Sequence, residues 1–136
     1  MEEKKKILLV CPPGTRRDCI RNCLKETGIK DEIAEVNDVS TALANLMCYG
    51  SAAVIFSDHN GVINALDFLK QLKAFEKGRF AGIPFIIIAK TGALDDVFEA
   101  GKLGVRGFIL FDPSDTKTIK SKVLKKLKDL LTGWLI

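Results

Sequence analysis

Short apolar runs recur along the chain, and segments with helical periodicity separate them. An apolar run of about four to eight residues between turn signals is typical of a buried strand. The intervening segments place apolar residues three and four apart, which predicts amphipathic helices. Strands are expected at residues 7–10, 32–36, 52–56, 85–88 and 105–111, and helices at about 15–27, 38–49, 62–75, 94–101 and 115–130.

This alternation predicts a doubly wound α/β fold, because right-handed crossovers with short loops produce a parallel sheet that helices cover on both faces. The chain has 136 residues, and its 47% of hydrophobic residues are enough for a buried core. It contains no long linker, so residues 1–136 are expected to form a single domain. In the flavodoxin-like strand order 2-1-3-4-5, ligands bind beyond the carboxyl ends of strands one and three.

The amino-acid composition of the chain argues against several classes of function. The net charge of +4 says little, and the lysines near the carboxyl terminus are most simply a solvated helix face. Nucleic-acid binding by this domain alone is not expected, because basic and aromatic residues do not cluster together. No apolar stretch approaches the roughly 20 residues of a membrane helix. Four cysteines without C-x-x-C spacing and one histidine argue against a zinc site and fit a reduced, cytoplasmic protein.

Polar residues follow the predicted third strand, where the sequence reads Ser57-Asp58-His59-Asn60. A carboxylate exposed at a strand end can attack a phosphoryl group and form an aspartyl phosphate. Asp58 is therefore a candidate phosphoacceptor, and the alternative is that it only turns the chain before the next helix. We expect its carboxylate to lie in the crevice beside Cys11, which follows the first strand. His59 is expected to be an exposed loop residue.

The order of these segments resembles the receiver domains of two-component response regulators. The resemblance covers about the whole chain and rests on residues 54–60, 66–70, 83–88 and 100–108. It implies that Asp58 is the phosphoacceptor and that Phe108 is the strand-five aromatic residue that reports the state of the pocket. It also implies a protein partner, either a histidine kinase or a downstream signalling protein, and it allows a homodimer.

The phosphorylation pocket departs from the receiver pattern. Receivers carry two acidic residues after strand one for Mg²⁺, a hydroxyl after strand four and a lysine after strand five. The corresponding residues here are Cys11, Pro12, Ala89 and Phe111. Mg²⁺ is usually bound through one or two carboxylates and phosphate oxygens, and only Asp58 and the Asn60 carbonyl remain. We expect a weak or absent magnesium site, with a dissociation constant above the millimolar range, and no other cofactor.

Lys90 follows Ala89 directly and is long enough to reach across the crevice. An unpaired carboxylate is costly in a partly buried site, so Lys90 is expected to supply part of the missing positive charge to Asp58. The alternative is that Lys90 points to water. Because Ala89 offers no hydroxyl, Phe108 is expected to hold one rotamer.

Two modes of signalling stay open at this point: a two-component phosphorelay, and a protein-interaction module that works without phosphorylation. The alternative from another class is a flavodoxin-like domain that binds a small molecule or nucleotide. Residues 11–15 match neither G-x-G-x-x-G nor a P-loop, which argues against it. An enzyme is not expected, because no set of base and nucleophile converges at the strand ends.

Overall fold

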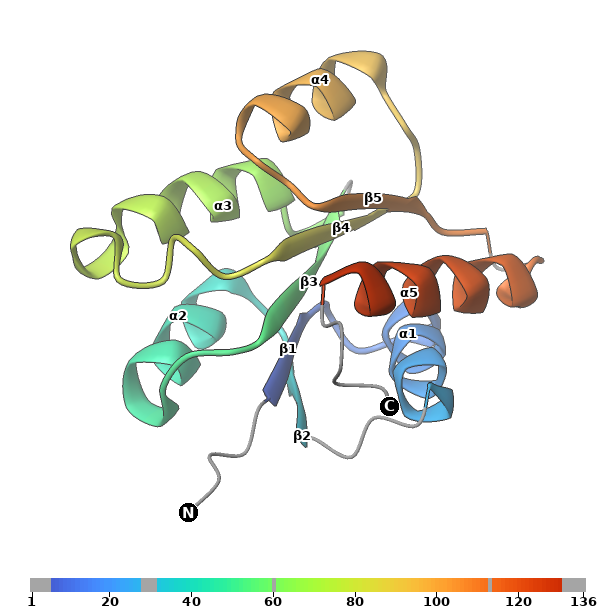
Figure 1. Cartoon of the computed structure of the whole chain (residues 1–136), viewed down its shortest axis with the longest axis horizontal. Helices are drawn as coiled ribbons and strands as arrows, with labels where there is room; N and C mark the ends of the chain where they lie inside the picture. The colour runs from blue at the N-terminus through green and yellow to red at the C-terminus, as the bar shows by residue number, and fades with distance from the viewer. Residues whose placement is uncertain (1–5, 28–31, 60, 113, 131–136) are drawn as a thin grey trace.

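The computed structural model describes residues 6–27, 32–59, 61–112 and 114–130, and they form a five-stranded sheet with helices on both faces (Figure 1). Neighbouring strands pair in parallel in the order β2-β1-β3-β4-β5, which confirms the predicted order. The strands are β1 (Lys6–Val10), β2 (Glu32–Val36), β3 (Val54–His59), β4 (Phe85–Ala89) and β5 (Gly107–Leu110).

The helices divide between the two faces of the sheet. Helices α1 and α5 contribute to one apolar cluster, while α2, α3 and α4 contribute to the other. The internal strands β1, β3 and β4 are buried along their whole length, so they need apolar residues on both faces, which explains the apolar runs at the start of β3 and throughout β1 and β4. The helices are α1 (Thr15–Glu26), α2 (Val39–Tyr49), α3 (Ala65–Ala74) with the short 3₁₀ turn η1 (Phe75–Gly78), α4 (Leu94–Lys102) and α5 (Thr116–Leu130).

The third strand differs from the prediction. It was expected at residues 52–56 with a polar loop after it, but β3 begins at Val54 and continues through His59. Ser57, Asp58 and His59 lie opposite Ile87, Ile88 and Ala89 of β4 in the parallel register. These polar residues stay in the strand because their backbone groups pair with β4, and their side chains find partners inside the protein.

Other differences concern the ends of elements. The third helix begins at Ala65 rather than near Val62, because the Asn64 side chain accepts hydrogen bonds from the first-turn amides of Leu66 and Asp67. Met47, expected on the buried face of α2, is 44% exposed. The side chain of Leu130, expected to face inward, lies outside the described residues.

The fifth strand is shorter than the predicted 105–111. The Val105 amide donates to the Ala100 carbonyl at the end of α4, so that residue closes the helix instead of extending the strand. The predicted start of the last helix is confirmed, since the Asp115 carboxylate accepts a hydrogen bond from the Thr118 amide. Within the described residues, no helix is long and apolar enough to span a membrane.

Candidate functional site

Asp58 lies near the carboxyl end of β3 with only 1% of its surface exposed. Strands β1 and β3 pair with Val10 opposite Ser57, so the next residues, Cys11 and Asp58, stand at the same edge of the sheet. Cys11 is buried as well, at 4% exposed. The structure thus places Asp58 beside Cys11, as the strand pattern predicted, but it buries the carboxylate that the sequence pattern treated as exposed.

The buried carboxylate of Asp58 has a cationic partner that sequence reasoning missed. Arg16 Nη2 donates a hydrogen bond to Asp58 Oδ2 at 2.8 Å, and Arg16 Nε lies 2.7 Å from Oδ1. The side chain of Asp58 is fully buried, and that of Arg16 is 17% exposed. One guanidinium therefore lies against both carboxylate oxygens, with a hydrogen bond to Oδ2 and a charge contact to Oδ1.

Burial raises the pKa values of two groups at this edge of the sheet, Asp58 and Cys11. Burial raises the pKa of the Asp58 carboxyl, and the Arg16 guanidinium opposes that rise. Burial also raises the pKa of the Cys11 thiol to about 11, and the charge of Asp58 adds to the effect. Cys11 is therefore a neutral thiol at physiological pH and supplies no negative charge to the pocket.

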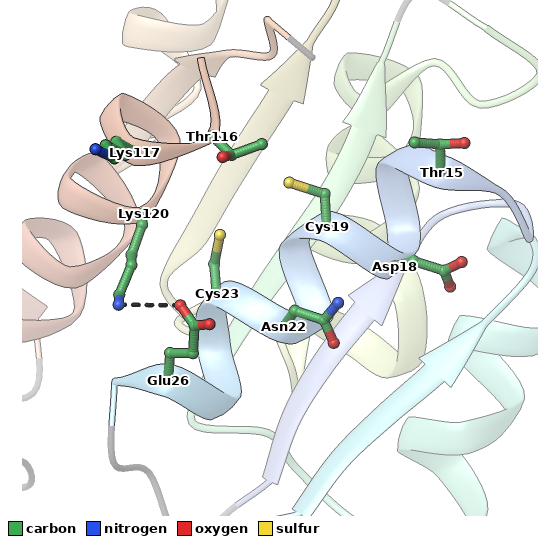
Figure 2. A pocket seen from close by; sticks show the side chains of 9 residues that line it. All are labelled: Thr15, Asp18, Cys19, Asn22, Cys23, Glu26, Thr116, Lys117 and Lys120. Carbon is green, nitrogen blue, oxygen red and sulfur yellow. Dashed lines mark ion pairs between the residues drawn. The ribbon is translucent and has the colours of Figure 1, made fainter. Parts of the chain in front are cut away.

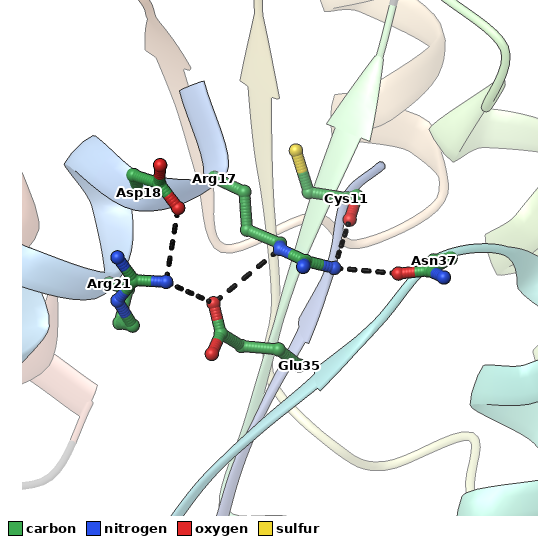
Figure 3. Close-up of polar contacts among 6 residues, drawn as sticks. All are labelled: Cys11, Arg17, Asp18, Arg21, Glu35 and Asn37. Carbon is green, nitrogen blue, oxygen red and sulfur yellow. Dashed lines mark hydrogen bonds and ion pairs between the residues drawn. The ribbon is translucent and has the colours of Figure 1, made fainter. Parts of the chain in front are cut away.

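The start of α1 is fixed by a second arginine. Arg17 Nη1 donates to the Cys11 carbonyl at 3.3 Å and to Asn37 Oδ1 at 2.6 Å, while its Nε lies 3.5 Å from Glu35. Arg21 contacts the same Glu35 carboxylate at 3.1 Å (Figure 3). These contacts join the first two turns of α1 to the ends of β1 and β2, so the helix that carries Arg16 is held against the sheet.

A sequence signal for these arginines did exist. Arg16 and Arg17 stand in the first turn of α1, where the helix dipole disfavours cations. Gly14 begins the helix at φ 154° and offers no side-chain cap. Two cations at an uncapped helix start, directly after a strand, indicate that acidic partners lie nearby.

His59 is not an exposed loop residue, and that expectation was wrong. It is 3% exposed, because it is the last residue of β3 and points into the core between α3 and α4. Its Nδ1 accepts a hydrogen bond from the Ala65 amide at 3.0 Å, which leaves Nε2 to donate to Asp96 Oδ2 at 3.0 Å. The ring also packs edge-on against Phe108 of β5, with the ring centroids 6.4 Å apart. The residue after Asp58 thereby contacts α3, α4 and β5.

Comparisons with known proteins show which solved structures share this fold. No family profile matches the chain, and no curated protein matches it either. Solved structures do match over nearly the full length. The phosphorylated cyanobacterial phytochrome response regulator RcpA has a TM-score of 0.78 at 21% identity, covering 96% of each chain. The Mn²⁺-bound response regulator Rcp1 has a TM-score of 0.76 at 21% identity, covering 95% of this chain and 96% of that one.

The chemotaxis protein CheY4 of Vibrio cholerae has a TM-score of 0.73 at 20% identity and covers 95% of this chain and all of its own. The chain has the fold of a response-regulator receiver domain. The expected resemblance is confirmed at the level of the fold, with the strand order and helix placement that it implied.

In this receiver fold the residues at the pocket do not fit a divalent cation. Both carboxylate oxygens of Asp58 face the Arg16 guanidinium. Cys11 is a neutral thiol, and Pro12 has no side-chain donor atom. Asn60, the second expected ligand, lies outside the described residues. Among the described residues, no group of three or more acidic, cysteine or histidine side chains could hold a metal.

Of the remaining predicted pocket positions, Lys90 and Phe111 line a cavity of about 700 Å³ and Ala89 does not. Ala89 is buried at the end of β4, and Lys90 after it is exposed. Phe111 is half-buried and packs on the α1 and α5 side of the sheet. The cavity is lined by Cys11, Pro12, Pro13, Gly14, Thr15, Arg16, Lys90 and Phe111.

The Lys90→Ala substitution is expected to raise the pKa of Asp58, and by less than Arg16→Gln does. The positive charge of Lys90 lowers that pKa, but it is the weakest of the influences there, whereas Arg16 contacts the carboxylate directly. An NMR titration of the Asp58 side-chain carboxyl carbon in both variants measures the difference. A larger effect for Lys90→Ala would assign Lys90, and not Arg16, as the main partner.

A second cavity, of about 540 Å³, lies between α1 and α5 on the other side of α1 (Figure 2). Cys19 and Cys23 project into it one helical turn apart, and Lys120 pairs with Glu26 across it at 3.0 Å. Burial raises the pKa of Cys23 to about 11, and the neighbouring Cys19 adds to the rise. The buried thiol of Cys23 is neutral at physiological pH and fills space between the two helices.

Proposed function

We propose that this protein is a receiver-type signalling module that binds a protein partner through the surface of α4 and β5. The observation that carries the proposal is the placement of His59. It directly follows Asp58, it donates a hydrogen bond to Asp96 on α4, and it packs against Phe108 on β5. One buried ring therefore ties β3 to α4 and β5 and holds the two elements that bear the proposed binding surface in one arrangement.

Exposed apolar side chains support a binding role for this surface. Leu94 and Phe98 on α4 are 67% and 63% exposed, and Val97 between them is 38% exposed. Leu110, near the end of β5, is 44% exposed. Large apolar side chains gathered on neighbouring elements are typical of protein-binding surfaces. We refer to these four residues as the α4–β5 surface.

Of the two signalling modes, we propose the one that works without phosphorylation. Phosphoryl transfer requires that the carboxylate can reach the phosphodonor and that the charge of the phosphoryl group is neutralised. Asp58 is buried, and its carboxylate is already paired with Arg16. The partner is a histidine kinase or a downstream signalling protein in the cytoplasm, and a second copy of the chain is the competing occupant of the same surface.

Replacing Phe98 and Leu110 together with glutamine is expected to weaken partner binding by about 30-fold, the effect of losing about 2 kcal/mol at an aromatic anchor. Both positions are exposed, so the fold should tolerate the change. Affinity capture from an extract of the source organism identifies the partner, and calorimetry with the purified partner measures the affinity.

The matched control is Tyr49→Gln, an 80% exposed aromatic side chain at the end of α2, away from the α4–β5 surface. A partner that binds the double variant as tightly as the unaltered chain argues against the proposed surface. Sedimentation of the purified chain separates a protein partner from self-association, because only self-association makes its mass depend on its own concentration.

A further inference from the structure

We propose that Arg16 is a permanent counter-charge for Asp58 and stands in place of the divalent cation that receiver pockets use. The inference rests on the proposed function and names its regulation: the pocket is kept in one state, and neither a metal ion nor a phosphodonor changes it. Arg16 forms the one ion pair that Asp58 makes in the described part of the chain, whereas Lys90 acts on the carboxylate only through its charge.

The contact geometry is the first step of the argument. A metal ion binds a carboxylate by approaching its oxygen lone pairs, and Arg16 already faces both oxygens, at 2.7 and 2.8 Å. The Gly61 backbone lies over the pair: a methyl group added at Gly61 would stand 3.6 Å from Arg16 Nη2 and 3.7 Å from Asp58 Oδ2. Gly61 therefore lies close to the pair on one side.

The second step concerns how firmly the guanidinium is held. Its helix is anchored by Arg17, which contacts the Cys11 carbonyl and Asn37. Arg16 would pay a dipole penalty in the first turn of α1 without a carboxylate partner, so Asp58 offsets that penalty. Displacing the guanidinium would leave a cation at a helix start and the fully buried Asp58 carboxylate without its ion-pair partner.

The third step is the effect on an incoming cation. A divalent ion at the Asp58 oxygens would stand within a few Å of the guanidinium, and like charges that close repel strongly in a partly buried site. The neutral thiol of Cys11 and the ring of Pro12 offer no compensating charge. Removing the guanidinium should therefore allow a cation to bind the carboxylate of Asp58. Water molecules would supply the other ligands of that cation.

The test is a titration of the ¹⁵N-labelled chain with Mn²⁺, read by paramagnetic broadening of the amide signals of Cys11, Asp58 and Gly61. The unaltered chain should show no broadening confined to these signals at millimolar Mn²⁺. Arg16→Ala should show it, with an affinity at least about tenfold higher. Arg17→Ala is the matched control, because Arg17 is the adjacent arginine and does not contact Asp58.

Equal Mn²⁺ affinity of Arg16→Ala and the unaltered chain, whether tight or undetectable in both, would overturn the proposal, as would a gain of the same size in Arg17→Ala. If Arg16→Ala does not fold, Arg16→Lys gives the same comparison with a smaller gain, because it keeps the charge and loses contact with both oxygens. A negative result in this titration does not bear on the proposed role of the α4–β5 surface. That role is contradicted only if the Phe98 and Leu110 double variant still binds the partner as tightly as the unaltered chain.

Discussion

The Arg16→Gln substitution is expected to lower the free energy of unfolding by about 3–5 kcal/mol, the range for breaking a buried ion pair from one side. The side chain of Asp58 is fully buried, so the carboxylate that remains has neither water nor a guanidinium to stabilise its charge. Urea denaturation at neutral pH, followed by circular dichroism, measures the change. Arg106→Gln, at an exposed position, is the control and should change the stability little.

The loss should depend on pH in a definite direction. Burial already raises the pKa of Asp58, and without Arg16 only the backbone hydrogen bond from His59 and, more weakly, the charge of Lys90 oppose that rise. The folded variant then holds a proton on Asp58 at pH values where the unfolded chain, with an Asp pKa of about 3.9, has released it. Because the folded state binds more protons in that window, the stability of the variant rises as the pH falls through it.

A second substitution separates the ion pair from packing. In an Asp58→Asn background the carboxylate is gone, so Arg16→Gln should cost much less than it does in the unaltered chain. If the two costs are equal, the pair contributes nothing specific and Arg16 acts only through the packing of its methylene groups.

Phe68→Ala is expected to lower the free energy of unfolding by about 3–5 kcal/mol, through lost burial and the cavity left behind. Phe68 is fully buried on α3 and packs edge-on against Phe85 of β4, with centroids 5.4 Å apart. The pair joins α3 to the sheet, so the loss of the Phe68 ring leaves a cavity between α3 and β4. The same denaturation assay measures the loss.

The size of the side chain should govern this effect. Phe68→Leu fills most of the space and should cost clearly less than Phe68→Ala. Val62→Ala, at a side chain 90% exposed three residues before α3, should change the stability within about 0.5 kcal/mol. If Phe68→Ala lowers the free energy of unfolding no more than Phe68→Leu does, the surrounding core closes around the space that the ring leaves.

Most of the fold could be predicted from the sequence because it depends on apolar periodicity, which is a local property of the chain. The runs at residues 7–10 and 85–88 are buried on both faces, and each became a strand of the sheet. The strand order needed the receiver resemblance, since local patterns do not specify which strands become neighbours. The placement of Asp58 beside Cys11 then followed from the order and the parallel register.

The rest depended on contacts between distant residues. Arg16 meets Asp58 across 42 positions of sequence, and a pattern of apolar residues contains no information about such a pair. The loop expected after residue 56 was wrong for a related reason. Ser57, Asp58 and His59 look like turn residues locally, but tertiary partners hold them inside β3. His59 in particular owes its burial to Ala65 and Asp96, which lie on two different helices.

The side-by-side position of α1 and α5 has a consequence for synthesis of the chain (Figure 1). Strand β1 is made first but takes a central place in the sheet, and the face that it shares with α1 is closed by Ile119, Val123 and Leu127 of the last helix. A ribosome-bound chain therefore carries an uncovered apolar face until α5 has emerged. An apolar face that stays exposed in this way favours aggregation, and this face is complete only when α5 has been made.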